Sequence, residues 1–133
     1  MTAPGVRIET VVLGPTETNC HVVRCDGVCW AVDPGFGPGR LVALLGRGSE
    51  RLEKILLTHA HADHIGGVEA LRKAFPQAEL CCPAGDAEML ADPELNLSAL
   101  FGLRLAVAPA GRLLQPGDRL TLGPSQWQVL DTS

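Results

Sequence analysis

The stretch Thr58-His59-Ala60-His61-Ala62-Asp63-His64 decides how the rest of this chain is interpreted. The sequence of 133 residues has four histidines, and three of them fall within this stretch with an aspartate between them. Imidazole and carboxylate groups are the ligands that suit zinc and similar divalent ions. A loop that only connects two elements has no reason to concentrate groups that repel one another when protonated. The stretch therefore predicts a metal site formed by His59, His61, Asp63 and His64.

The sequence on either side places this stretch between a strand and a helix. Residues 52–57 are mostly apolar and predict a buried strand, and a helical pattern opens at Ile65. Side chains two apart in an extended segment point the same way, so we expect His59 and His61 to hold one ion together. The following aspartate and histidine come after the chain bends, near a helix N-terminus. We expect that pair to face a second ion beside the first.

Further from the stretch, strands come first and then alternate with helices. Asp26-Gly27 is a strong signal for a two-residue hairpin turn. The expected strands cover residues 6–13, 19–25, 28–33, 52–57 and 78–82, with a final hairpin of 113–122 and 125–131. The expected helices cover residues 39–47, 65–75 and about 85–91, with one further turn at 97–101. Residues 102–112 receive no assignment.

Composition limits the classes of function. The hydrophobic content of 46% is enough for a buried core, and a net charge of −4 without basic runs argues against nucleic-acid binding. No apolar run is long enough to span a membrane, and the N-terminus lacks the pattern of a signal peptide. Five irregularly spaced cysteines predict reduced, buried thiols in a cytoplasmic protein. The glycosylation sequon Asn96-Leu97-Ser98 is then expected to be unused.

Several stretches together point to a known family. His59-x-His61-x-Asp63-His64 resembles the signature of the metallo-β-lactamase superfamily. Thr18-Asn19-Cys20-His21-Val22-Val23 and Trp30-Ala31-Val32-Asp33-Pro34-Gly35 resemble the opening hairpin of its glyoxalase II-like hydrolases, and residues 92–98 are similar to a segment of short bacterial members. The resemblance implies an α+β fold, the four-layer αββα sandwich. The single domain at residues 1–133 would be about its N-terminal half.

The resemblance also implies an activity. It indicates a binuclear metal hydrolase of the glyoxalase II (hydroxyacylglutathione hydrolase) type with two divalent ions, zinc first, and iron or manganese as alternatives. A metal-bound hydroxide would attack the carbonyl of a small thioester substrate such as an acylated glutathione. Asp63 is then a metal ligand and a candidate contact of the attacking water. A lactonase, a phosphodiesterase and an iron dioxygenase acting on persulfides remain alternatives within the same superfamily.

Two residues outside the signature are expected to support the ligands. Asp33 ends a strand and begins Asp-Pro-Gly, which by itself favours turn chemistry. The resemblance instead favours a buried carboxylate that orients the ligand loop. Thr58 could hydrogen-bond within that loop or cap the helix. Gly66 and Gly67 would give the loop room, hold a bound anion or simply add flexibility.

Other polar and thiol side chains receive structural interpretations. His21 lies in the middle of an expected strand and is left out of the site. Cys81-Cys82 lies on an apolar strand, where core packing is favoured over metal or redox chemistry. Asp86 and Glu88 are expected on a solvated helix face.

The ligand set is incomplete within these 133 residues. After His64 the sequence has no histidine, whereas the resembled family adds a Gly-His motif, a bridging aspartate and a further histidine. Catalytic zinc sites keep three protein ligands, and each ion here would have two. A half-sandwich would also expose an apolar sheet face. We therefore expect a fragment of a longer protein, or an inactive half-domain that self-associates or needs a complementary C-terminal half, and poor metal retention by the isolated chain.

Overall fold

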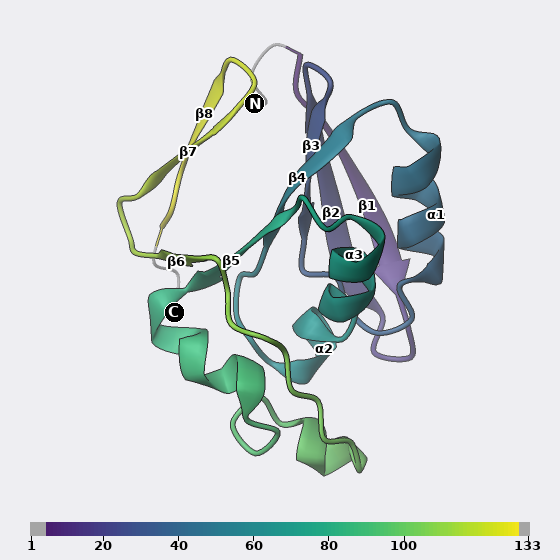
Figure 1. The fold of residues 1–133 in the computed structure, drawn as a ribbon, viewed down its shortest axis with the longest axis vertical. Coiled ribbons are helices and arrows are strands. Elements are labelled where there is room, and N and C mark those ends of the chain that lie inside the picture. Colours follow the sequence, from purple (N-terminus) through teal and green to yellow (C-terminus); the bar gives the residue numbers. More distant parts are fainter. Residues whose placement is uncertain (1–4, 131–133) are drawn as a thin grey trace.

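The computed structural model describes residues 5–130, and its main element is a six-stranded mixed sheet (Figure 1). The strands follow one another in space in chain order: β1 (Arg7–Leu13), β2 (Thr18–Cys25), β3 (Val28–Val32), β4 (Arg51–Leu56), β5 (Glu79–Pro83) and β6 (Arg112–Leu114). The first three strands are antiparallel, and β3 to β6 run parallel. A separate antiparallel hairpin consists of β7 (Arg119–Leu122) and β8 (Ser125–Gln128).

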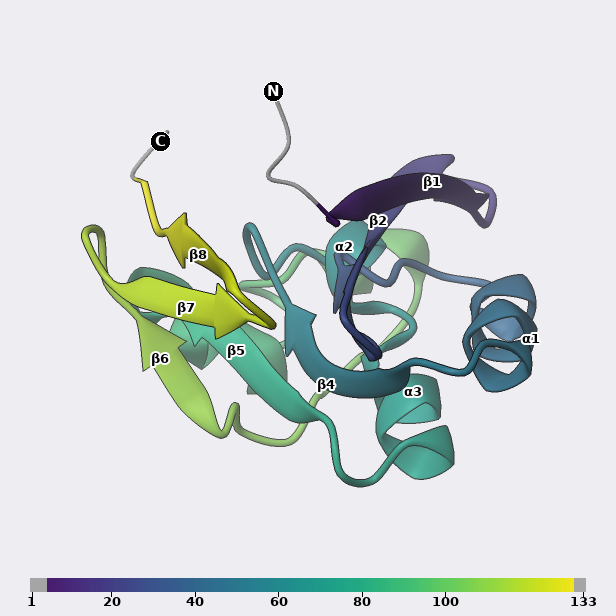
Figure 2. The same cartoon turned by 90° about the horizontal axis from the view of Figure 1, so that it is seen from above.

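The helices and the hairpin lie on opposite faces of this sheet (Figure 2). The helical elements are α1 (Gly39–Arg47), α2 (Ala62–Ile65), α3 (Val68–Ala74) and the 3-10 helices η1 (Ala84–Ala91) and η2 (Ser98–Phe101). One core packs α1 and α3 against the sheet, and the second packs the β7–β8 hairpin against the other face. The rings of Trp30 and Trp127 meet in this second core, with their centroids 5.8 Å apart.

The sequence of β2 shows why both faces are buried. Cys20 and Val22 point into the helix-side core, while Val23 and Cys25 point into the hairpin-side core. Successive side chains of a strand alternate between faces, so the apolar residues of β2 contribute to both cores. The predicted β2–β3 turn is confirmed: Asp26 (φ 53°) and Gly27 both have positive φ, which a two-residue type I′ turn requires.

The helix predicted over 65–75 is confirmed for Val68–Ala74 (α3), but it does not begin at Ile65, because the chain breaks at Gly66-Gly67 between α2 and α3. A Cβ on Gly66 would lie 2.4 Å from Cδ1 of Phe36, so only glycine permits this approach. The N–H of Gly67 donates to the carbonyl of Pro34 at 2.7 Å. The two glycines therefore seat the ligand loop tightly against the loop that follows β3.

The predicted strand over 113–122 is also wrong as a single element. Residues 112–114 form β6 and pair with β5, whereas 119–122 form β7 of the hairpin. Between them the chain turns, and Asp118 Oδ2 accepts the N–H of Gln115 at 2.9 Å. The partner strand ends at Gln128, and residue 131 of the expected strand lies outside the described residues. The helix expected near 85–91 is the 3-10 helix η1.

The hairpin leaves part of the sheet face uncovered. A cavity of 340 Å³ lies between the hairpin and the sheet, with Trp30, Leu114 and Trp127 among its lining residues. Within residues 5–130, no helix has the length and apolar character needed to cross a bilayer.

Candidate metal centre

The candidate site lies where three parallel strands end. Asp33 directly follows β3, and Thr58 and His59 are the second and third residues after β4. Asp86 lies in the 3-10 helix that follows β5. Parallel strands bring their carboxyl ends to the same edge of a sheet, and ligands of such sheets bind at that edge. The topology therefore gathers polar groups that are up to 53 residues apart (86 minus 33) around one loop.

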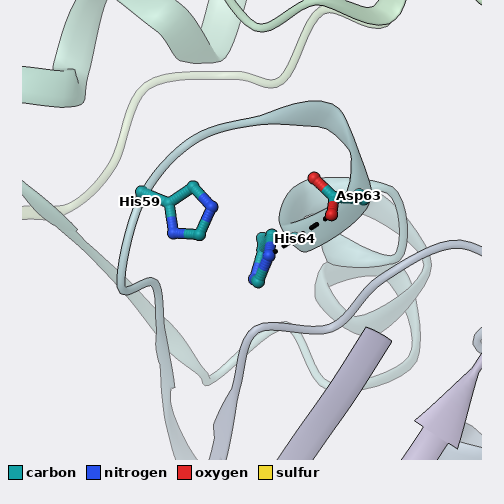
Figure 3. Close-up of side chains that lie close together, drawn as sticks. All are labelled: His59, Asp63 and His64. Atoms are coloured by element: carbon teal, nitrogen blue, oxygen red, sulfur yellow. Dashed lines mark ion pairs between the residues drawn. The ribbon is translucent and has the colours of Figure 1, made fainter. Parts of the chain in front are cut away.

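Three of the four predicted ligands come together (Figure 3). His59, Asp63 and His64 each offer a ligand atom, and these atoms all lie within 4.8 Å of one another. The ring centroids of His59 and His64 are 3.9 Å apart. His61 is not part of this group, although its ring centroid lies 5.0 Å from that of His59. The division of the four ligands between two ions stays a prediction.

His64 lies between two carboxylates. Its Nε2 is 3.4 Å from Oδ2 of Asp63, and its Nδ1 is 3.1 Å from Oδ2 of Asp33. The second contact is not aligned as a hydrogen bond, and within residues 5–130 His64 Nδ1 is the one buried side-chain nitrogen or oxygen without a hydrogen-bond partner. A carboxylate only accepts hydrogen bonds, so a proton on Nδ1 of His64 would point toward Asp33 when Nε2 binds a metal. The Nε2 lone pair is then available to a metal beside Asp63.

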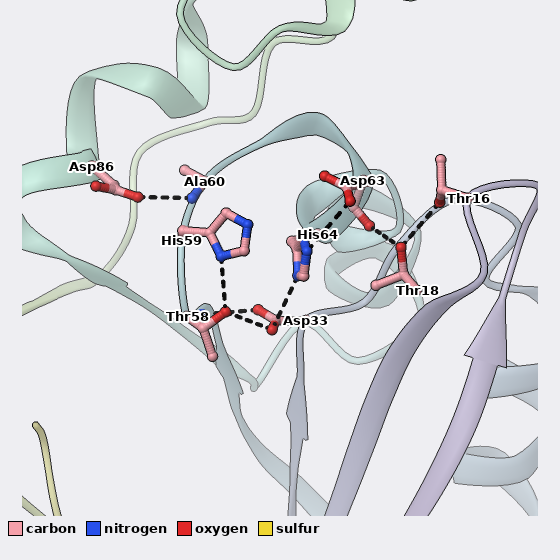
Figure 4. A network of polar contacts seen from close by, with 9 residues as sticks. All are labelled: Thr16, Thr18, Asp33, Thr58, His59, Ala60, Asp63, His64 and Asp86. Carbon is pink, nitrogen blue, oxygen red and sulfur yellow. Dashed lines mark hydrogen bonds and ion pairs between the residues drawn. The ribbon is translucent and has the colours of Figure 1, made fainter. Parts of the chain in front are cut away.

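Asp33 holds the end of the ligand loop. This residue is 5% exposed, and its carboxylate accepts the Thr58 N–H at 2.8 Å and the Thr58 hydroxyl at 2.7 Å (Figure 4). Its φ of 57° is in the left-handed region, which a non-glycine residue adopts only when its surroundings fix it. Both oxygens of this carboxylate thus face the loop that carries the histidines.

The Thr58 hydroxyl extends this arrangement to His59. Thr58 Oγ1 lies 3.1 Å from His59 Nδ1, and its single proton already goes to Asp33. The oxygen therefore accepts the Nδ1 proton of His59, which leaves the Nε2 lone pair free. Burial lowers the pKa of His59, and the nearby His64 lowers it further. His59 is thus held as the neutral imidazole that a metal requires.

Asp86 corrects the expectation of a solvated helix face. Its Oδ2 accepts the N–H of Ala60 at 3.0 Å (Figure 4), so it holds the backbone between the first two histidines. Glu88 is exposed, as predicted. No local sequence pattern indicated the role of Asp86, because its partner is 26 residues away and is a backbone group.

Sequence reasoning also missed two supports of the loop. Thr18 Oγ1 donates to the backbone carbonyl of Asp63 at 2.6 Å. The carbonyl of Asn96 accepts the N–H of Ala62 at 2.7 Å. A Cβ on Gly35 would lie 2.6 Å from the same Asp63 carbonyl, so this glycine lets the β3 loop pass beneath the ligands.

The remaining side chains singled out from the sequence lie away from the cluster. His21 contacts Thr10 across the β1–β2 pair, with Nδ1 3.0 Å from Oγ1. All five cysteines are buried and free, and burial raises the pKa of Cys82 to about 12. The predicted core packing of Cys81-Cys82 is confirmed, since both residues are fully buried. Asn96 is also fully buried, so the acceptor side chain of the sequon is not exposed.

The residues present fit a divalent metal ion. Two imidazoles and a carboxylate form a donor set suited to zinc or iron, with their ligand atoms already gathered. The buried, unpartnered His64 Nδ1 facing Asp33 is the second-sphere arrangement that commonly accompanies a metal-bound imidazole. A cavity of 630 Å³ opens beside the cluster, with His59, His61 and Asp86 among its lining residues. The arrangement can bind a metal and admit a small molecule next to it.

Comparison with known proteins gives matching results. Residues 7–132 match the sequence profile of the family described as "Metallo-beta-lactamase superfamily". The "Probable metallo-hydrolase YqgX" of Bacillus subtilis is 32% identical over 121 residues, which are 90% of this chain and 57% of that protein. The "Hydroxyacylglutathione hydrolase" of Aeromonas salmonicida is 45% identical over 82 residues, which are 58% of this chain and 31% of that protein.

Solved structures show the same architecture. The BLEG-1 B3 metallo-beta-lactamase aligns with a TM-score of 0.84 and 35% identity over 92% of this chain and 59% of that one. TTHA1623, solved in a di-iron-bound form, aligns with a TM-score of 0.71 and 32% identity over 84% of this chain and 56% of that one. The chain thus spans little more than half the length of these neighbours. The likeness confirms the predicted α+β sandwich fold, of which these residues form about half.

Proposed function

Because the chain belongs to the metallo-beta-lactamase superfamily, we propose that it carries the metal-binding loop of a hydrolase that cleaves small thioesters. The observation that carries this proposal is the meeting of His59, Asp63 and His64 at the carboxyl ends of β3 and β4. The 45% identity to a hydroxyacylglutathione hydrolase over 82 residues supports a thioester, such as an acylated glutathione, as the substrate.

The proposed cofactors are two divalent ions, with zinc first and iron or manganese as alternatives. His59 and His61 would hold one ion, and Asp63 and His64 the other. When bound, such ions lower the pKa of a water ligand toward neutrality and polarise the carbonyl of a substrate. The di-iron form of TTHA1623, a 32% identical neighbour, keeps iron among the candidates.

The chain's own contribution is to hold its ligands in the correct proton state. The carboxylate of Asp33 lies 3.1 Å from Nδ1 of His64, where it would accept the Nδ1 proton, and the Thr58 hydroxyl, which donates to Asp33, accepts the Nδ1 proton of His59. Both imidazoles then present a bare Nε2 without a proton having to leave when the metal binds. Asp63 has one oxygen beside His64 and its side chain is 39% exposed, so it also reaches the space where an attacking water would be oriented.

Further ligands would come from a complementary segment. Each ion has two of its proposed ligands within these residues, and catalytic sites of this kind use three. We propose that a C-terminal half, on the same gene product or on a second chain, supplies the others and covers the apolar cavity beside the β7–β8 hairpin. Five buried free thiols suit a reducing compartment, and we propose a cytoplasmic location.

A second candidate activity follows from the structural comparison. BLEG-1, which aligns with a TM-score of 0.84, is a B3 metallo-beta-lactamase. Cleavage of a β-lactam amide needs the same polarised carbonyl and oriented water as cleavage of a thioester. The two activities differ in the leaving group, because a thiolate leaves without protonation more readily than an amine.

The test uses the whole gene product, purified and loaded with zinc or iron in separate preparations. S-lactoylglutathione, glutathione persulfide and a chromogenic cephalosporin are supplied in parallel, with thiol release and oxygen uptake recorded. The proposal expects thiol release from S-lactoylglutathione without oxygen uptake, and loss of that activity in His59→Ala. Oxygen uptake with the persulfide, or turnover of the cephalosporin alone, would overturn the thioesterase assignment.

A further inference from the structure

An unusual segment borders the metal-ligand loop at Ala62. Residues 95–98 alternate in the reverse of the usual sense, with the leucines exposed and the polar residues buried. Leu95 is 46% and Leu97 40% exposed, whereas Asn96 and Ser98 are fully buried. Apolar side chains normally occupy the buried positions, so this inversion needs an explanation.

The buried polar residues are fully used in holding the segment. The Asn96 amide donates to the carbonyls of Met89 and Leu105, both at 2.9 Å, and its oxygen accepts the N–H of Ser98. Ser98 Oγ accepts the N–H of Leu105 at 3.0 Å. Every one of these bonds fixes local backbone, so the segment is a rigid support.

The same support is tied directly to the ligand loop. The Asn96 carbonyl accepts the N–H of Ala62, the residue between His61 and Asp63. Leu97 itself has a φ of 70°, a conformation unfavourable for leucine that persists only when its neighbours impose it. The 3-10 helix η2, drawn in light green, accordingly lies directly below α2 in Figure 1.

This support presents an exposed apolar group, the apolar shelf, formed by Leu97, Leu100 and Phe101. Leu100 is 78% and Phe101 57% exposed. The shelf lines a cavity of 180 Å³ whose other walls include His61 and Asp63. Of the nine large hydrophobic residues exposed within residues 5–130, five lie between 95 and 103. Concentrated exposed apolar surface marks a binding site.

We propose that the apolar shelf is a substrate subsite that takes a short hydrocarbon chain whose polar end is held at the metal centre. A cavity of 180 Å³ that is lined by two predicted metal ligands, His61 and Asp63, has room for a few carbon atoms beside the metal centre. The inference deepens the proposed function and rests on it, because the metal centre would fix the carboxyl or thioester end. The shelf then selects for acyl groups with an apolar tail.

The test is a binding series on the metal-loaded full chain, using acetate, butyrate and hexanoate as probes. Leucine-methyl NMR reports both the affinity and the place of binding, and it also shows that each variant is folded. The affinity should rise roughly two- to fourfold per added methylene, in line with partial burial of each CH₂, and hexanoate should shift the Leu97 and Leu100 methyl signals. In Leu100→Ser and Phe101→Ser the increase with chain length should disappear.

The matched control is Leu113→Ser, since Leu113 is 49% exposed and lines none of the three cavities described above. This variant should show the same rise in affinity from acetate to hexanoate as the wild type. The inference is overturned if hexanoate binds no better than acetate, if it leaves the Leu97 and Leu100 signals unmoved, or if the Leu100 and Phe101 variants keep the full series. If affinity rises with chain length as expected but no thioester is hydrolysed, the result contradicts the proposed function and still supports the subsite.

Discussion

The carboxylate of Asp33 accepts both the backbone N–H and the hydroxyl of Thr58, at 2.8 and 2.7 Å. These two bonds join the end of β3 to the end of β4 across 25 residues of sequence. They also place one buried negative charge beside His64 and, through the threonine hydroxyl, next to His59. A single carboxylate thus lies against one predicted ligand, His64, and is linked to a second, His59, through Thr58.

Asp33→Asn tests this role, because asparagine tolerates the left-handed backbone, removes the charge and replaces one acceptor oxygen with an NH2 donor. We expect zinc affinity to fall by about 10- to 100-fold with the fold retained. Competition against a chromophoric chelator measures the affinity, and circular dichroism checks the fold. Asp118→Asn is the matched control, since Asp118 also accepts a backbone N–H but lies in the turn before β7. Equal affinities in the two variants would contradict the assigned role.

Thr58 offers a sharper pair of variants. Thr58→Val keeps the shape but removes the hydroxyl that accepts the His59 proton, so we expect a drop of about tenfold in zinc affinity. Thr58→Ser retains the hydroxyl and should keep affinity near that of the wild type. The same competition assay measures both. If valine and serine behave alike, the hydroxyl does not set the His59 tautomer.

Asp86→Ala should destabilise the protein, because Ala60 is fully buried and its N–H would lose its acceptor. Leaving such a donor unsatisfied costs about 1–3 kcal/mol. Glu88→Ala, on the same 3-10 helix but exposed, should change stability by less than about 0.5 kcal/mol. Urea unfolding at neutral pH compares the two. A neutral outcome for Asp86→Ala would mean that water replaces the carboxylate.

Two glycine-to-alanine changes should have opposite effects on the free energy of unfolding. Gly66→Ala places a Cβ 2.4 Å from the Phe36 ring and forces the ligand loop to move, which should cost about 1–3 kcal/mol. Gly46→Ala, in α1, meets no heavy atom within 4 Å and should stabilise by about 0.5–1 kcal/mol. Thermal unfolding measures both changes. Stabilisation by Gly66→Ala would disprove the close packing of this loop.

The ion-pair cluster at Glu50 predicts a pH dependence. Glu50 lies 2.9 Å from Arg24 and 2.8 Å from Arg7. Burial opposes ionisation, but a backbone hydrogen bond and Arg24 outweigh it and hold the pKa of Glu50 below its ordinary value of 4.5. A lowered pKa stabilises the fold fully above the unfolded value, and this contribution is lost as the pH falls through the folded value.

Urea unfolding of the wild type and Glu50→Gln across pH should therefore show a gap in stability at pH 7 that narrows below about pH 4.5. The matched control is Glu94→Gln, because Glu94 is exposed and forms no ion pair among residues 5–130. A gap that stays constant down to about pH 3 would contradict the lowered pKa.

Local signals in the sequence were sufficient for many elements. Asp26-Gly27 favours a two-residue turn by its own backbone preference, and the apolar run before Thr58 predicts a strand. The histidine-rich stretch identified the loop of the candidate site because its chemistry is concentrated in seven residues. Each of these signals is contained within a short window of sequence.

The errors arose where distant contacts decide the structure. The helix predicted over 65–75 breaks because Gly66 packs on Phe36, which is 30 residues earlier (66 minus 36). Asp86 has the pattern of a surface residue, yet it bonds to Ala60 across the end of the sheet. The strand over 113–122 splits because residues 112–114 find an open edge at β5. None of these partners can be identified from local periodicity.

The most direct test of the central claim is the zinc affinity of the wild type, His64→Ala and His21→Ala, measured side by side by chelator competition. His64 lies in the predicted cluster, whereas His21 contacts Thr10 on β1 and belongs to no ligand group within residues 5–130. The account predicts a loss of at least about tenfold in affinity for His64→Ala and wild-type affinity for His21→Ala. Equal affinity in all three proteins would contradict a metal centre at this loop.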